Sequence, residues 1–411
     1  MKSLTRGHLK AGFDSVRRAK WRNFWTMLGI IIGVASVITT VSIGEGVKQQ
    51  VSDQITRSGK NLITVRPGTL RSAEAQNGGN INVLSGLSIT GSLLPDDIAA
   101  VENTKGVSSS APLAAISATV RADQGRYQGG MVIGTTSDLP ALLNRSLAQG
   151  VFLIDDDEGM KVAVLGAAAA ESMFDVSVPL GYTFTINGEE FIVRGIFEDF
   201  GNTPLSDQAN YNSSIFIPYD VSQQLTKNTA VIYEILAKTN DTKVVDSTVT
   251  SLQKSLQRVH GGQDNFSVLG PDETIASRNS ILNLLTGLVS GVAAISLLVG
   301  GIGIMNVMLV SVTERMHEIG IRKAIGATNR QILSQFMIES SLLSVSGGII
   351  GVAVAFVLNG LMRFFTNLRP VISWEIVLIA FGVSLVVGIV FGSIPALKAA
   401  RKDPIEALRI Q

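Results

Sequence analysis

The sequence predicts a membrane protein built from four transmembrane α-helices and one large α+β module outside the bilayer. Four uncharged apolar runs, at 23–44, 281–313, 340–362 and 376–397, each reach the roughly 20 residues that span a bilayer core. A 236-residue stretch, 45–280, separates the first run from the second. The mean hydropathy of +0.33 and the charged fraction of 16% agree with this fold class.

The first apolar run is predicted to be a retained anchor. Basic residues precede it, as they do in a secretory signal peptide. However, the run is longer than the apolar core of a signal peptide, and no small-x-small cleavage pattern closes it near Ile43, Gly44 and Glu45.

The distribution of Lys and Arg predicts the orientation. Residues 1–44 carry seven Lys and Arg against the single acid Asp14, whereas residues 45–280 carry 17 Lys and Arg against 26 Asp and Glu. By the positive-inside rule, the N-terminus, the loop 314–330 and the basic tail 398–409 lie in the cytoplasm. We therefore expect three regions: 1–44 with the first span, 45–280 outside the membrane, and 281–411 with three further spans.

The outer module is expected to contain two β-α-β units that bracket an insert. In the first unit, a strand is predicted at 62–66, a helix at 95–103 and the next strand after a break at Gly106-Val107. In the second unit, strands are predicted at 231–238 and 266–269 and a helix at 241–259. The insert, roughly 111–226, is richer in strand patterns and contains Asn187-Gly188 between two alternating apolar runs, which predicts a hairpin. The Gly/Asn-rich stretch 77–82 reads as a loop. Because the chain has no Cys, the module depends on its apolar core.

Several motifs together resemble the MacB-like, FtsX-type ABC transporter permeases. They are VAVLG at 162–166, PLG at 179–181, IFIP at 215–218, GGIG at 300–303, the segment 314–327 and the tail 395–408. The resemblance covers essentially the whole chain. It implies a porter-like outer region with an inserted β-rich subdomain, a homodimer in the cytoplasmic (inner) membrane, and mechanical coupling of ATP use to movement of the outer domains.

The resemblance also implies a separate ABC ATPase subunit. Some members carry a fused nucleotide-binding domain, but this sequence contains no Gly-x-x-x-x-Gly-Lys-Ser/Thr motif; its only Gly-Lys pair, Gly59-Lys60, precedes Asn61. We therefore expect no cofactor and no catalytic residue on this chain, with ATP and Mg on the partner. The near-neutral net charge of +1 suggests no nucleic-acid partner.

The segment 314–330 is the predicted ATPase-coupling site. Charged side chains suit a groove on an ATPase, Ile319 and Ile325 offer apolar contact, and Gly320 and Gly326 permit close approach or a turn. The candidate coupling residues are Glu314, Arg315, Glu318, Ile319, Arg322, Lys323 and Gly326. A second candidate contact is the tail 401–408, where Asp403-Pro404 is typical of a helix start.

Two pairs of glycines are predicted helix-packing sites, and two helical extensions are predicted to flank the outer module. Gly287 with Gly291, and Gly347 with Gly351, have the spacing that lets helices approach closely in lipid, within a subunit or between two. Helical extensions at 45–58 and 273–284 are candidates for a stalk that links cytoplasmic closure to the outer domains.

Other chemistry is not indicated. The acidic run 155–158 lacks the EF-hand spacing and reads as a solvated loop, and His8, His260 and His317 are too scattered for a metal site or a catalytic triad.

The function expected is efflux of peptides, antibiotics or other amphipathic substrates, with a periplasmic adaptor and an outer-membrane channel as further candidate partners. Two alternatives stay open: a lipoprotein-releasing permease, and a signalling permease that controls a cell-wall hydrolase.

Overall fold

The computed structural model describes residues 20–68, 92–176, 178–201 and 210–402, without the side chains of 20–26 and 58. The predicted loop 77–82 and positions 403–408 of the predicted tail contact lie outside the described residues. The chain divides into a helical unit, Met1–Gly46 with Asn283–Gln411, and a sheet unit, Val47–Leu282.

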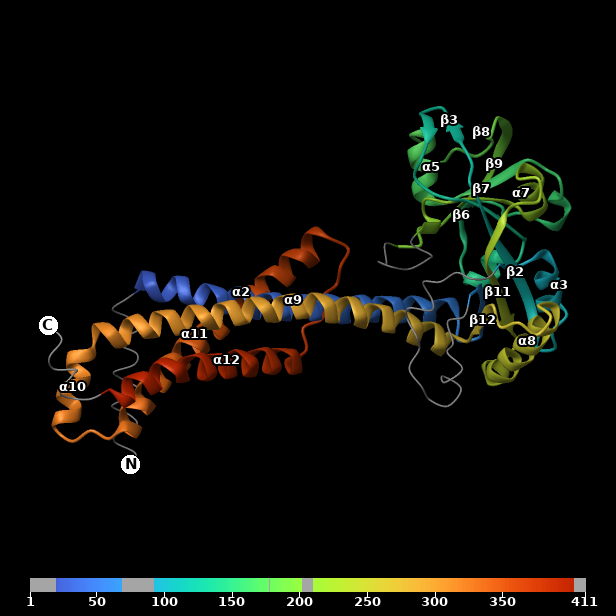
Figure 1. The fold of residues 1–411 in the computed structure, drawn as a ribbon. Helices are drawn as coiled ribbons and strands as arrows, with labels where there is room; N and C mark the ends of the chain where they lie inside the picture. Colours follow the sequence, from blue (N-terminus) through green and yellow to red (C-terminus); the bar gives the residue numbers. More distant parts are fainter. Residues whose placement is uncertain (1–19, 69–91, 177, 202–209, 403–411) are drawn as a thin grey trace. The chain divides into compact units, whose positions relative to one another are not determined.

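Within the described residues, four helices are long and apolar enough to cross a membrane, which confirms the four predicted spans. They are α2 (Lys20–Ser58), α9 (Pro271–Glu314), α11 (Asn329–Phe365) and α12 (Trp374–Arg401) (Figure 1). A short helix, α10 (Met316–Ala324), connects α9 to α11. Both α2 and α9 are longer than the apolar runs that predicted them. Each helix continues without a break across the boundary between the two units, which falls after Gly46 in α2 and after Leu282 in α9.

Glycine and serine let the helices of the helical unit pack closely. Along α11, Ser340 and Ser344 lie against Gly392 and Gly388 of α12, and Gly348 lies against Ser384. These contacts recur every four residues, the spacing at which one helix face meets another. The apolar core around them includes Ile30, Val34, Leu297, Ile304, Phe336 and Leu343.

The sheet unit contains one continuous mixed sheet of 12 strands in the order β12-β1-β11-β2-β5-β10-β7-β9-β8-β3-β4, with β6 paired to β9. The strands are β1 (Leu62–Pro67), β2 (Val107–Ile116), β3 (Val120–Ala122), β4 (Gly125–Tyr127), β5 (Val132–Thr135), β6 (Leu147–Gly150), β7 (Val162–Leu165), β8 (Thr183–Ile186), β9 (Glu189–Phe197), β10 (Ile215–Pro218), β11 (Val231–Thr239) and β12 (Phe266–Leu269).

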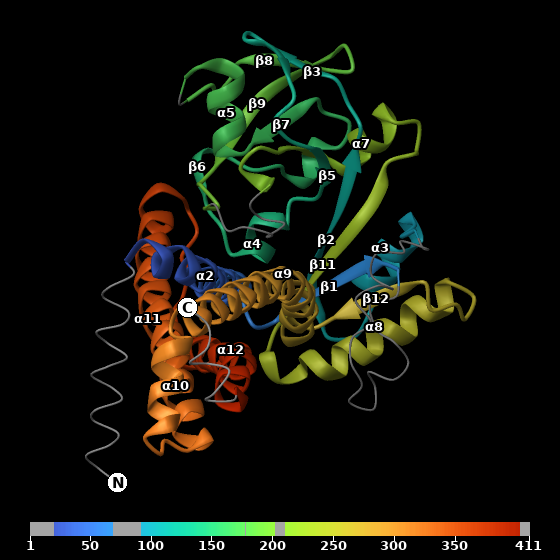
Figure 2. The same ribbon diagram turned by 60° about the vertical axis from the view of Figure 1, so that its left-hand side comes forward.

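Helices cover both faces of the β12-β1-β11-β2 part of the sheet. Alternate residues of β1 and β11, such as Ile63 and Ile235, face α3 (Pro95–Glu102) and α8 (Val245–Val259) in one core cluster. The residues between them, such as Leu62 and Leu236, face α4 (Leu139–Leu143) on the other side. Figure 2 shows α3 and α8 together beside these strands. The predicted strands and helices of the two β-α-β units are confirmed.

The β-rich insert is present, with α5 (Ala167–Phe174) and α7 (Tyr219–Leu225) packed on its strands. Asn187 and Gly188 form the predicted hairpin turn between β8 and β9, with φ of 53° and 88°. Position 111, the expected start of the insert, lies inside β2, which pairs with β11 along most of its length and with β5 at its end. The insert therefore continues the same sheet.

Candidate functional site

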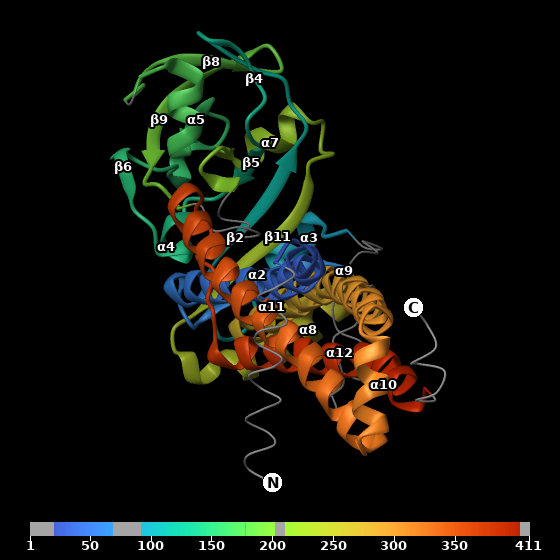
Figure 3. The same ribbon diagram turned by 90° about the vertical axis from the view of Figure 1, so that its left-hand side faces the viewer.

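The candidate site is the segment from Glu314 to Gly326, called the α10 segment here. Helix α9 ends at Glu314, Arg315 leaves helical geometry, and α10 starts at Met316. Gly326 has φ of 102°, a left-handed conformation that favours glycine, so the chain can turn after α10. Thr328 then caps α11 by accepting from the Gln331 N–H at 3.3 Å. Figure 3 shows α10 where α9 ends and α11 begins.

The inner side of the α10 segment is fixed to the rest of the helical unit. Ile319 is 2% exposed in the apolar core, and Gly320 beside it is buried. Arg315 Nη1 lies 3.3 Å from both carboxylate oxygens of Glu339 on α11. Lys323 Nζ donates to the carbonyl oxygens of Ala400 and Lys402, each at 2.7 Å.

The outer side of the segment is open. Its exposed residues are Glu314, His317, Glu318, Ile321, Arg322, Ala324, Ile325 and Gly326, and Ile325 is 80% exposed. Glu318, Ile321 and Ile325 follow at steps of three and four, the spacing of one helix face. These three residues, with Glu314 and His317 before them, are called the outward face here. Arg322 borders this face, 4.0 Å from Glu318, and also donates to Gln335 Oε1 at 2.7 Å. Carboxylates next to exposed isoleucines suit a protein partner with a basic, partly apolar groove.

The structure divides the predicted coupling residues into two groups. Glu314, Glu318 and Arg322 lie at the surface, and Gly326 forms the turn. The expected surface role of Ile319 is wrong for this structure, because its side chain is in the core. Arg315 and Lys323 are also engaged within the subunit. Ile321, which is 45% exposed, was not among the predicted coupling residues, because the sequence alone does not show that Ile319 points inward.

Of the four glycines proposed for helix packing, two contact another helix of the subunit and two do not. Gly347 and Gly351 on α11 face Ile30 and Val34 of α2, with no room for a larger side chain at Gly351. A Cβ at Gly287 or Gly291 on α9 would meet no described atom within 4 Å.

A close approach that the sequence analysis missed occurs between Gly29 and Gly300, where α2 and α9 cross backbone to backbone. Gly300 stands in the GGIG motif, which could have indicated it.

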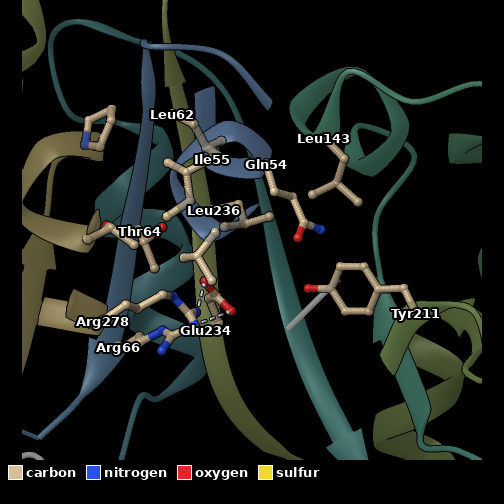
Figure 4. Close-up of a pocket in the computed structure, with 13 residues that line it drawn as sticks. Gln54, Ile55, Leu62, Thr64, Arg66, Leu143, Tyr211, Glu234, Leu236 and Arg278 are labelled. Carbon is tan, nitrogen blue, oxygen red and sulfur yellow. Dashed lines mark hydrogen bonds and ion pairs between the residues drawn. The ribbon is translucent and has the colours of Figure 1, made fainter. Parts of the chain in front are cut away.

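A small charged cavity lies within the sheet unit (Figure 4). Arg66 Nη2 lies 3.3 Å from Glu234 Oε2, and the Arg66 and Arg278 side chains both point toward this carboxylate. Gln54 of α2 and Thr274 of α9 also line the cavity, so its wall includes the outer ends of two membrane-spanning helices. Its volume of about 70 Å³ leaves room for only a few water molecules, which excludes an organic substrate.

Two contacts of buried carboxylates in the sheet unit were not expected. His260 Nε2 lies 3.0 Å from Asp97 Oδ1 and joins the end of α8 to the first turn of α3. Asp157, within the acidic run 155–158, pairs with Arg194 and is buried, so the expectation of a solvated loop is wrong for this residue. Nearby, burial and then the charge of Asp155 raise the pKa of the Asp138 carboxyl. Among the described residues, no three His, Asp or Glu side chains could hold a metal ion.

Comparisons with known proteins agree with this architecture. The MacB-like periplasmic core domain matches residues 24–255, and the FtsX-like permease C-terminal domain matches 290–404. The macrolide export ATP-binding/permease protein MacB of Azoarcus sp. (strain BH72) is 37% identical, over 97% of this chain and 58% of that protein. The chain thus spans somewhat more than half the length of such a relative.

A second relative matches over almost its full length. The uncharacterized ABC transporter permease YknZ of Bacillus subtilis (strain 168) is 31% identical, over 98% of this chain and 99% of that protein. Among solved structures, the periplasmic region of MacB from Actinobacillus actinomycetemcomitans is 21% identical, with a TM-score of 0.43, over 54% of this chain and 93% of that one.

Four spanning helices with a periplasmic-type sheet unit define the chain as a membrane protein with an extracytoplasmic domain. It belongs to the MacB/FtsX-type family of ABC transporter permeases, as the sequence motifs indicated.

Proposed function

We propose that this chain is the permease subunit of an export system in which a separate ABC ATPase binds the outward face of the α10 segment. ATP hydrolysis on that partner moves the sheet units and so drives efflux of amphipathic peptides, antibiotics or similar compounds. The observation that carries the proposal is the two-sided α10 segment: its inner side is bonded to α11 and α12, and its outer side presents carboxylates and isoleucines.

The proposed location is the cytoplasmic membrane, with α10 on the cytoplasmic side. The predicted crossing of the membrane by α9 supports this location, since it puts α10 and the extracytoplasmic unit on opposite sides. The bias of Lys and Arg toward the N-terminus and the tail supports the same orientation. An ATPase in the cytoplasm could therefore reach the outward face.

The proposed mechanism is mechanical, and it requires no bond chemistry on this chain. Helices α2 and α9 extend without a break from the membrane spans to the cavity around Glu234 in the sheet unit. A continuous helix transmits displacement along its axis. ATP and Mg belong to the ATPase, and the permease converts its closure into movement of the extracytoplasmic unit.

The working form is proposed to be a homodimer that meets along α9. Six apolar residues of α9 recur at alternating steps of three and four and are all exposed: Leu285, Leu288, Val292, Ile295, Val299 and Ile302. Asn306 continues the same spacing and is exposed, with no side-chain hydrogen bond in the described part of the chain. Two parallel copies would bring Asn306 against Asn306, where the amides can pair, and the open sides of Gly287 and Gly291 allow close approach.

The substrate class is inferred from the relative named for macrolide export. Macrolides combine a large apolar body with polar groups, and peptides of similar character would suit the same route. A periplasmic adaptor and an outer-membrane channel are proposed to receive the substrate where the host envelope has an outer membrane.

In-cell photo-crosslinking tests the ATPase partner. A photoreactive benzoyl-phenylalanine placed at Ile325 should capture a protein with an ABC-type nucleotide-binding domain, identified by mass spectrometry. The same group at Phe364, an exposed residue at the opposite end of α11, is the control and should not capture it. Absence of any such ATPase from the Ile325 product would remove the outward face as its binding site.

A further inference from the structure

We propose that Lys323 and Arg315 are positioning residues that pass the movement of the α10 segment to α12 and α11. The inference rests on the proposed function, since it concerns how a displacement by the ATPase is transmitted. It goes beyond that function by assigning transmission to two inward-facing bonds, distinct from the outward face that contacts the partner.

Lys323 joins α10 to the end of α12. Its ammonium donates to the carbonyl oxygens of Ala400 and Lys402, both at 2.7 Å, in the last turn and at the C-cap of that helix. The last four carbonyls of a helix have no partner within the helix and carry the negative end of its dipole, so a cation is favoured there. One side chain therefore both completes the end of α12 and ties α10 to it.

Arg315 joins the other end of α10 to α11. It stands at the break between α9 and α10, and its guanidinium bonds the Glu339 carboxylate, whose side chain is only 7% exposed. The next residue, Ser340, packs on Gly392 of α12, so this bond reaches α11 where α11 and α12 are in contact. A buried carboxylate that loses its partner is costly, which favours one fixed position of Arg315.

Without these two bonds, α10 would be attached by the exposed bond from Arg322 to Gln335 and by a short apolar contact. Ile319 and Gly320 are its only buried residues among those described, with Met316 partly buried beside them. Its two ends are a non-helical Arg315 and the Gly326 turn, both of which can bend. A displacement of the outward face would then be taken up by rotation of α10 and would reach α11 and α12 weakly.

The test uses the full permease purified with its ATPase, spin-labelled at Lys254→Cys on the exposed side of α8 in the otherwise Cys-free chain. Lys323→Met removes the charge and the donor but keeps the length of the side chain. Lys398→Met is the matched control, because Lys398 is exposed in the last turn of the same α12. ATPase retention, the KM for ATP and the ATP-dependent change in the distance between labels are measured in each.

Lys323→Met is expected to retain the ATPase and its KM for ATP while the fraction of complexes that change distance falls about fivefold or more. Lys323→Arg, which keeps charge and donors, should recover most of the change, and Lys398→Met should match the wild type. The exchange of Arg315→Glu with Glu339→Arg should recover movement that Arg315→Glu alone loses.

A full distance change in Lys323→Met would overturn the inference and leave the proposed function intact. Failure of the double exchange to recover any movement would overturn the role of the Arg315 bond. No distance change in the wild type would instead count against the proposed function itself.

Discussion

Ile319 and Ile325 lie on opposite sides of the α10 segment, six residues apart: Ile319 is 2% exposed in the core of the helical unit, and Ile325 is 80% exposed. A helix with 3.6 residues per turn would bring positions six apart to different faces, and the end of α10 at Ala324 increases the separation. Ile319 therefore helps to hold the segment, whereas Ile325 is accessible to a partner.

The two isoleucines should respond differently to substitution. Ile325→Ser removes exposed apolar surface, so the stability of the chain should change by less than about 0.5 kcal/mol, while ATPase binding should weaken by about 1–2 kcal/mol. Ile319→Ala leaves a cavity and should destabilise the helical unit by about 2–4 kcal/mol. Thermal unfolding in detergent and ATPase co-purification separate the two effects. If Ile325→Ser were destabilised as much as Ile319→Ala and lost the ATPase to the same extent, the result would argue against an outward contact at Ile325.

Charge reversal on the outward face should impair binding of the ATPase without affecting the fold. Glu318→Lys places like charges beside Arg322 at i, i+4, which costs about 0.5 kcal/mol within the helix and about 1–3 kcal/mol at the interface. Arg322→Glu should act similarly and also loses the bond to Gln335. The permease should remain at normal abundance while ATPase-linked export falls. Normal co-purification and export in both variants would show that this face is not the coupling surface.

The orientation can be tested with single cysteines, since the chain has none of its own. Cys at Lys254 in α8 should react with an impermeant maleimide in intact cells or spheroplasts, and Cys at Asn329, the first residue of α11, should react only after the membrane is opened. Both positions are exposed, so burial does not explain a difference. Equal labelling of the two in sealed cells would be incompatible with the proposed topology.

The dimer seam predicts cross-links at specific positions. Val299→Cys and Asn306→Cys should form disulfide-linked dimers under mild oxidation in membranes, because a two-fold axis brings each residue next to its own copy. Ile379→Cys on α12 is as exposed as Val299 but lies off the seam and serves as the control. Dimers from Ile379→Cys alone would place the interface on α12 and would contradict the α9 seam.

Much of the fold follows from local pattern. The four spans depend on run length and the absence of charge, and the hairpin at Asn187 and Gly188 depends on two residues that accept positive φ. Neither feature requires knowledge of distant neighbours. The start of the insert was less accurate because β2 carries one apolar pattern through both parts of the sheet, so no composition change marks the boundary.

The sidedness of the α10 segment could not be deduced from its own residues. Its inner side is defined by Glu339 on α11 and by the end of α12 at Ala400, which are 24 and 77 residues away from their partners Arg315 and Lys323. A basic, amphipathic stretch of nine residues has no internal signal for which cations bond inward. The Asp97 and His260 pair, 163 residues apart, was missed for the same reason.

We propose that ATP use by a cytoplasmic partner moves the extracytoplasmic unit through this chain. The most direct measurement is the distance between spin labels at Lys254→Cys in the two copies of the purified complex, recorded without nucleotide and after trapping with ATP and vanadate. We predict a shift of the distance distribution on trapping, which Ile325→Ser should reduce. An unchanged distribution in a complex that hydrolyses ATP would contradict the account.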